Sequence, residues 1–125
     1  MKEAIQIKGA PAPIGPYSQA IKKGNMLFVS GQIPLNPFTG QLENENISSA
    51  TKRVMENIGA LLQEAGMNYD DIVKCSIFLK DLENFSVVNE IYASYFSSAP
   101  PARETVEVSK LPLDVMIEIS CIAIK

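Results

Sequence analysis

Residues 47–65 read ISSATKRVMENIGALLQEA, and the architecture of the whole chain can be worked out from this stretch. Its apolar residues recur at helical spacing, so the pattern predicts a helix with one apolar stripe. Asn46 or Ser48 can cap the start, and Gly66 supplies the left-handed residue that ends the helix. The stripe consists of Ile47, Ala50, Val54, Ile58, Leu61, Leu62 and Ala65. A helix of this kind needs a surface to cover, and the neighbouring segments predict a sheet.

Strands flank this helix in the sequence. Residues 25–32 and 71–80 form apolar or alternating runs that predict strands, the first of them in a central position. A second helix is expected over 84–97, and two further strands are predicted over 103–108 and 115–124. This order of elements fits an α+β fold, in which two helices cover one face of a mostly antiparallel or mixed sheet.

The last predicted strand is apolar on both sides. Alternation places Val115, Ile117, Ile119, Cys121 and Ala123 on one side, and Met116, Glu118, Ser120, Ile122 and Ile124 on the other. On strand 71–80, Val73, Cys75, Ile77 and Leu79 likewise point one way. Because two helices cover only one face of the sheet, the second apolar face predicts burial against other subunits, and therefore a homo-oligomer.

Length and composition limit the class of protein. The chain has 125 residues, 46% of them apolar and 20% charged, which suits one domain over 1–125 with its own core. No apolar run approaches the roughly 18 residues of a membrane span, and the N-terminus carries no signal-peptide pattern, so we expect a cytoplasmic protein. The formal net charge of −3 disfavours broad electrostatic binding to nucleic acid.

The absence of His narrows the chemistry further. It excludes every mechanism that uses imidazole as acid, base or metal ligand. Cys75 and Cys121 lie in strand-like apolar settings with no CxxC pair, so we interpret them as buried small hydrophobes rather than as ligands or a disulfide. No metal site is predicted. Any chemistry must come from Arg, Lys, carboxylate, hydroxyl, amide and backbone groups.

Two charged residues are candidates for such chemistry. Arg103 follows a Pro-rich turn at the start of a strand, where a fixed guanidinium suits a carboxylate. Glu118 lies on the strand side that is expected to meet another subunit, where a raised carboxyl pKa would suit it to handling protons or water. For each residue the alternative is an ordinary outward-facing charge, and the spacing alone favours that alternative.

Three further positions could line a pocket. Tyr17 is held in a Pro/Gly-rich loop, where it could close a pocket and offer a hydroxyl, or simply anchor the loop on the core. Ser30-Gly31 ends a strand, and Gly there permits close approach of backbone or ligand. Asn89 interrupts the apolar face of the second helix, where a polar group needs a partner. Taken separately, none of these signals identifies a function.

Taken together, the motifs resemble the YjgF family of reactive-intermediate deaminases, and its RidA branch in particular. The matching stretches are GPYSQA at 15–20, LFVSGQIPL at 27–35, PPAR at 100–103, VEV at 106–108 followed by LP at 111–112, and VMIEI at 115–119 followed by Ile122-Ala123. The resemblance covers essentially the whole chain, and several motifs in family order and spacing are far more specific than any one of them.

The resemblance implies a chorismate-mutase-like fold, a homotrimer, and an active cleft at each subunit boundary. Members of this kind hydrolyse 2-iminobutanoate and 2-iminopropanoate, reactive intermediates released by pyridoxal-phosphate enzymes, to the 2-keto acid and ammonia. This activity is a form of metabolite damage control. It needs no cofactor and no metal, and it involves no nucleic acid and no membrane.

The resemblance also implies roles for individual residues. Arg103 matches the arginine that grips the substrate carboxylate, Glu118 the glutamate that positions or activates water, and Tyr17 the tyrosine that borders the pocket. Ser30, Gly31 and Asn89 match positions in or near the cleft. This chain departs from the family at Thr105, where many members carry Cys. The departure removes a thiol near the substrate and leaves the effect on rate open.

Two other functions remain as alternatives. A non-catalytic member of the family would bind small carboxylates in the same clefts, and the missing thiol and the absence of a strong nucleophile favour it. RNA cleavage or inhibition of translation has also been attached to some family members. The net charge of −3 and the lack of a basic stripe count against that activity here.

Overall fold

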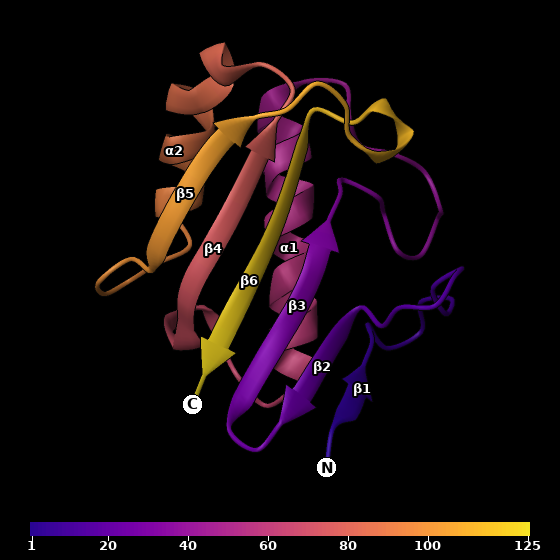
Figure 1. The fold of residues 1–125 in the computed structure, drawn as a ribbon. Helices are drawn as coiled ribbons and strands as arrows, with labels where there is room; N and C mark the ends of the chain where they lie inside the picture. Colours follow the sequence, from indigo (N-terminus) through magenta and orange to yellow (C-terminus); the bar gives the residue numbers. More distant parts are fainter.

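The computed structural model describes all residues from Met1 to Lys125 and contains two helices and one six-stranded sheet. The helices are α1 (Ile47–Glu64) and α2 (Phe85–Ala93). The strands are β1 (Glu3–Ile5), β2 (Ala20–Lys23), β3 (Met26–Gln32), β4 (Ile72–Leu79), β5 (Ala102–Glu107) and β6 (Ile117–Ile124). Their order is β1-β2-β3-β6-β4-β5, with β4 and β5 parallel and the other pairs antiparallel (Figure 1). This arrangement confirms the predicted α+β fold with a mixed sheet.

Helix α1 begins and ends where the sequence predicts. The Asn46 side chain accepts a hydrogen bond from the Ser49 amide at 2.8 Å and so caps the first turn. Gly66 follows the helix with φ at +76°, a conformation that favours glycine because it has no Cβ. Of the two predicted caps, the structure therefore uses Asn46.

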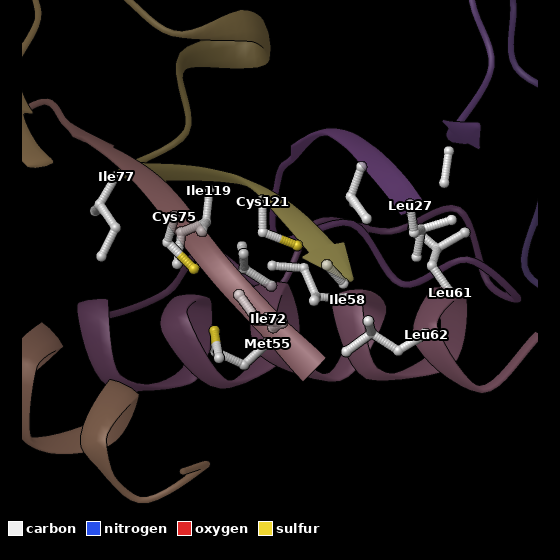
Figure 2. Packing of buried hydrophobic residues seen from close by; sticks show 14 of the residues in the cluster. Leu27, Met55, Ile58, Leu61, Leu62, Ile72, Cys75, Ile77, Ile119 and Cys121 are labelled. Carbon is white, nitrogen blue, oxygen red and sulfur yellow. The ribbon is translucent and has the colours of Figure 1, made fainter. Parts of the chain in front are cut away.

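The buried face of α1 packs against one face of the sheet. Figure 2 shows Ile58 and Leu61 of the helix on the same side of the sheet as Leu27 of β3 and Ile119 of β6. All four side chains are completely buried. Burying each of them stabilises the fold by about 1.5–3 kcal/mol. This packing fixes which side chains of each strand face the helices, and the faces in turn position the candidate site.

The two cysteines belong to this core. Cys75 of β4 and Cys121 of β6 are cross-strand neighbours, and both are buried and free. Burial raises the pKa of both thiols, so they stay protonated at neutral pH. The structure confirms the interpretation of these residues as small hydrophobes.

One residue of β4 faces the other way from the prediction. Alternation placed Val73 with the buried side chains of this strand, but Val73 is 43% exposed and Ile72 is buried instead. The cause is a bulge in the pairing with β6, where Ile72 pairs with Ala123 and Lys74 already pairs with Ile122. The extra residue reverses the alternation at this one position.

Helix α2 is shorter than the predicted span of 84–97. After Ala93 the amides of Ser94, Tyr95 and Phe96 bond to carbonyls three residues earlier, so the chain continues in tighter turns. The aromatic side chains still pack inward, with the Tyr92 and Phe96 rings 4.9 Å apart. The apolar pattern therefore predicted burial correctly, although the α-helix ends early.

Strands β1 and β2 were not predicted. They form antiparallel pairs at one edge of the sheet, and Gly24, with φ at +59°, makes the turn from β2 into β3. Each of these strands is only three or four residues long, so neither offers enough alternation for a period to be recognised.

The sheet face turned away from the helices carries no covering element (Figure 1). Phe28, Val106 and Ile124 lie on this face and are each about two-fifths exposed, at 42%, 41% and 38%. The apolar second face expected from the last strand is therefore present. No helix is long and apolar enough to cross a membrane.

Candidate active site

Arg103 lies at the start of β5 and faces α2. It pairs with the buried Cys75 in the parallel β4–β5 register, so its side chain is on the helix-covered side of the sheet. Its Nη1 donates a hydrogen bond to Asn89 Oδ1 at 2.7 Å. The guanidinium carbon lies 5.1 Å from the centre of the Tyr92 ring and 5.5 Å from that of Phe85. Three side chains of α2 thus hold one planar cation in place.

The Arg103 guanidinium has no counter-charge within the chain. Neither Asn89 nor the two aromatic rings carries a charge, and Arg103 forms no salt bridge. Burial raises the pKa of the Tyr92 phenol, which therefore stays neutral. The residues Asn89, Tyr92, Ala93, Pro100, Pro101 and Arg103 line a pocket. A fixed cation with unused N–H donors at a pocket suits a small anion such as a carboxylate.

Thr105 shares the face of Arg103, two residues further along β5. It pairs with the buried Ile77, and its Oγ1 is buried without a hydrogen-bond partner. Buried hydroxyls are normally paired, so this atom retains an unused donor and acceptor. The departure from the family pattern thus places an unpaired hydroxyl on the Arg103 side of the sheet.

Glu118 lies on the opposite face of the sheet, in β6. It lies against Gly31, at the end of β3: a Cβ atom on Gly31 would lie 2.6 Å from Glu118 Cδ. The carboxylate therefore occupies the space that any side chain at residue 31 would need. Partial burial raises the Glu118 carboxyl pKa above its ordinary range.

A bulge in β3 brings Gly31 to this position. Four residues of β3, from Val29 to Gln32, lie opposite only three residues of β6, from Cys121 to Ile119. Bulges bend a strand and change the direction of its side chains. Here the irregularity falls on Ser30 and Gly31, where the sequence suggested close approach.

Tyr17 and Ser30 belong to the same region as Gly31. Ser30 Oγ donates to the Ser18 carbonyl at 2.7 Å, and the Ser30 amide donates to the Gln19 carbonyl at 2.9 Å. These bonds fasten the Tyr17 loop to β3. Tyr17 is 59% exposed, and it lines a pocket together with Gly31 and the loops that follow β1 and β3.

The candidate residues therefore form two groups. Arg103, Asn89 and Thr105 make up the β5 group, and Tyr17, Ser30, Gly31 and Glu118 make up the β3 group. In the register of β4, Arg103 is opposite Cys75 and Glu118 is opposite Phe78, three residues away and on the other face. One chain does not bring Arg103 and Glu118 together.

Two contributors to the site were missed by sequence reasoning. Phe85 and Tyr92 have the spacing of buried helix residues, and nothing in that spacing indicates that Arg103 lies over their rings. Only the position of α2 beside the start of β5 reveals the contact. No group of three or more His, Cys, Asp or Glu side chains is arranged to hold a metal ion.

Comparison with known proteins gives concordant matches. The family described as endoribonuclease L-PSP matches residues 7–125. A RutC family protein of Pyrococcus abyssi is 55% identical over 99% of this chain and 98% of its own length. The 2-iminobutanoate/2-iminopropanoate deaminase of Escherichia coli is 42% identical over 100% of this chain and 99% of its own length. The crystal structure of Escherichia coli TdcF with bound serine superposes with a TM-score of 0.92 at 37% identity, covering 98% of both chains.

Proposed function

The chain belongs to the endoribonuclease L-PSP family, also known as YjgF/RutC, and from that premise we propose that it hydrolyses 2-iminobutanoate and 2-iminopropanoate to 2-keto acids and ammonia. The observation that carries the proposal is the Arg103 guanidinium, held by Asn89, Phe85 and Tyr92 without a counter-charge. A 2-imino acid carries a carboxylate next to its reactive carbon. Because the guanidinium is held in place, binding the carboxylate there also orients the imine carbon.

The proposal includes assembly into a homotrimer. Arg103 and Glu118 face opposite sides of one sheet, so a cleft that uses both residues needs the β5 group of one subunit and the β3 group of another. The uncovered apolar sheet face, with Phe28 and Val106, supports such an assembly. The subunit boundary then forms the active cleft.

Glu118 handles the proton in the proposed reaction. The oxygen of a water molecule bonds to the imine carbon while the C=N π pair moves to nitrogen. Glu118 takes a proton from that water and returns it to the nitrogen, which gives a carbinolamine. Glu118 then takes the proton of the new hydroxyl group and passes it to the amine nitrogen, so the C=O bond of the 2-keto acid forms as the C–N bond breaks and ammonia leaves. The raised pKa of its partly buried carboxyl suits this role, because an acid–base catalyst works best with a pKa near the operating pH.

Tyr17 and Thr105 complete the cleft in this proposal. Tyr17 projects from a loop that is fastened to β3, and it borders the pocket beside Gly31. The buried Thr105 hydroxyl, unpaired within the chain, is available to a polar group of the substrate. Ser30 and Asn89 act chiefly by holding Tyr17 and Arg103 in place.

A carboxylate-binding role without turnover is the second candidate. The structure of TdcF with bound serine favours it, because serine presents a similar carboxylate and amine. The two functions differ in a single observable. Both predict binding of a 2-keto acid or amino acid through Arg103, and only the deaminase predicts faster loss of the imine.

A coupled assay tests the proposal. A pyridoxal-phosphate dehydratase generates the imine, and keto-acid formation is followed with wild type, Arg103→Ala and Lys52→Ala, an exposed cation on α1 that serves as the charge-matched control. We expect Arg103→Ala to lower kcat/KM about 30- to 1000-fold and Lys52→Ala to leave it unchanged. Wild-type protein that binds 2-oxobutanoate without accelerating imine loss would establish the second candidate instead.

A further inference from the structure

Asn57 is a buried polar residue in the middle of α1. It is 3% exposed, and apart from Thr51 the other buried residues of the helix are apolar. Asn is a poor helix former, and an amide buried without partners is costly. Its position therefore requires an explanation in terms of what its side chain binds.

The Asn57 amide binds the chain that leaves β3. Its Nδ2 donates to the carbonyls of Leu35 at 2.9 Å and Ile33 at 3.3 Å, and its Oδ1 accepts from Arg53 Nε at 3.2 Å. Two acceptors on one side and a donor on the other fix the orientation of the amide. Both donors of Asn57 are thus used on a segment outside the helix.

That segment is a loop folded on itself, in which the amides of Asn36 and Glu43 donate to the carbonyls of Gln41 and Pro34. Between Ile33 and Glu43 the chain belongs to no helix or sheet and contains one isolated bridge, from Leu35 to Leu42. Asn36 donates to Glu43 at 2.9 Å, and Glu43 lies 3.9 Å from Arg53, so a second polar link leads back to α1. Asn57 and Arg53 therefore attach this loop to the helix.

The loop forms part of the pocket wall. Ile33, Leu35 and Asn57 line the same pocket as Tyr17 and Gly31. The bound carbonyl of Ile33 is only two residues beyond Gly31, which touches Glu118. A shift of this backbone would thus change the pocket beside the proposed proton-transfer residue.

We propose that Asn57 is a positioning residue: its side-chain amide holds the Ile33–Leu35 backbone as the pocket wall beside Gly31. The proposal rests on the proposed function for its effect on substrate, and on hydrogen bonds alone for its effect on the loop. No other side chain donates to either carbonyl. A misplaced wall weakens substrate binding, because contacts made at the wrong distance lose most of their value.

Asn57→Asp tests the proposal with little change in shape. The carboxylate keeps an acceptor for Arg53 and removes both donors. Thr51→Val is the matched control: Thr51 is also fully buried in α1, but its hydroxyl donates at 2.7 Å to Ile47 of the same helix. Where Asn57→Asp does not fold, Asn57→Ala replaces it, since Ala also lacks both donors.

Hydrogen exchange decides the structural part without any substrate. The amides of Asn36 and Glu43, which are bonded within the loop, are expected to exchange about 10-fold faster in Asn57→Asp than in wild type or Thr51→Val. Equal exchange in all three proteins overturns the proposal. This readout stands whether or not the wild type is a deaminase.

Steady-state kinetics decide the functional part. KM for the imine is expected to rise about 10-fold in Asn57→Asp with kcat changed less than about 3-fold, while Thr51→Val leaves both constants near wild type. Unchanged KM in Asn57→Asp, or an equal rise in Thr51→Val, overturns the positioning role. An inactive wild type would refute the proposed function, and loop exchange would then decide this proposal by itself.

Discussion

Arg103 and Tyr17 are held in place by different parts of the molecule. Arg103 stands on β5 and is clamped by three residues of α2, so regular structure on both sides fixes its guanidinium. Tyr17 stands in a loop that Ser30 fastens to a bulged strand end, and the facing wall is held by Asn57. Arg103 is thus held by regular structure on both sides, whereas the Tyr17 loop and the facing wall depend on a few hydrogen bonds of loop residues.

This difference suggests that the two groups have different roles in the proposed cleft. Binding a carboxylate requires a guanidinium that is held in place, and α2 and β5 hold that of Arg103. The pocket beside Gly31 is lined largely by loop residues, which are more mobile than the strands that carry them. Substitutions in the β5 group should therefore act through local contacts, whereas those at residues around Glu118 should act through displacement of the wall and of the Glu118 carboxylate.

The largest expected effect is at Glu118. Glu118→Gln keeps the shape of the side chain and removes its ability to move a proton. We expect kcat to fall about 10²- to 10⁴-fold, while binding of 2-oxobutanoate changes by less than about 3-fold. Single-turnover assays and calorimetry measure the two quantities. A variant that keeps more than half of the wild-type rate would remove Glu118 from the chemistry.

Gly31→Ala should have the next largest effect. The added methyl group would occupy the space of the Glu118 carboxylate and displace it, so we expect kcat to fall about 10- to 100-fold. Because this loss acts through Glu118, the double variant Gly31→Ala/Glu118→Gln should be no slower than Glu118→Gln alone. Fully additive losses would show that Gly31 contributes by another route.

Thr105→Val addresses the β5 group and should have a smaller effect. The change is nearly isosteric and removes a buried hydroxyl that has no partner, so we expect a gain in the free energy of unfolding of about 1 kcal/mol. If the hydroxyl serves the substrate, KM should rise at the same time. Chemical denaturation and steady-state kinetics separate the two effects, and a loss of stability would contradict the account of this hydroxyl.

The smallest expected effect is the pH dependence of stability at Glu118. Burial raises its folded-state pKa above the ordinary 4.5, so the folded chain binds this proton more tightly than the unfolded chain. Glu118 therefore costs stability as pH rises from about 4.5 through its folded pKa, and the cost remains at higher pH. Relative to wild type, Glu118→Gln should therefore gain in Tm as the pH rises from 4 to 8. A Tm difference that does not change with pH would contradict the raised pKa.

Much of this fold could be predicted from two periodicities of the sequence, the helical spacing of apolar residues and the alternation along strands. Helical spacing located α1, with Asn46 as one of two candidate caps, and alternation assigned Arg103 and Glu118 to definite sides of their own strands. What alternation could not supply was the relation between those strands. That relation depends on the shared register with β4, which places the two residues on opposite faces.

The errors and omissions of the sequence analysis also arise from contacts between separate elements. Val73 is exposed because the pairing of β4 with β6 contains one extra residue, and a bulge leaves no clear mark in a single sequence. The contact of Arg103 with the rings of Phe85 and Tyr92 depends on where α2 lies beside the start of β5. Contacts between elements far apart in the chain are tertiary properties, and the local pattern of either element does not contain them.

Mixing two inactive variants tests the central claim, a cleft shared between copies, most directly. Arg103→Ala and Glu118→Gln are unfolded together, refolded as an equal mixture and assayed for imine hydrolysis. If each cleft takes Arg103 from one subunit and Glu118 from another, about a quarter of the clefts in the mixture carry both native residues, and about a quarter of the wild-type activity returns. If the mixture stays as inactive as the separate variants, the two groups do not meet across a subunit boundary, and the account is wrong.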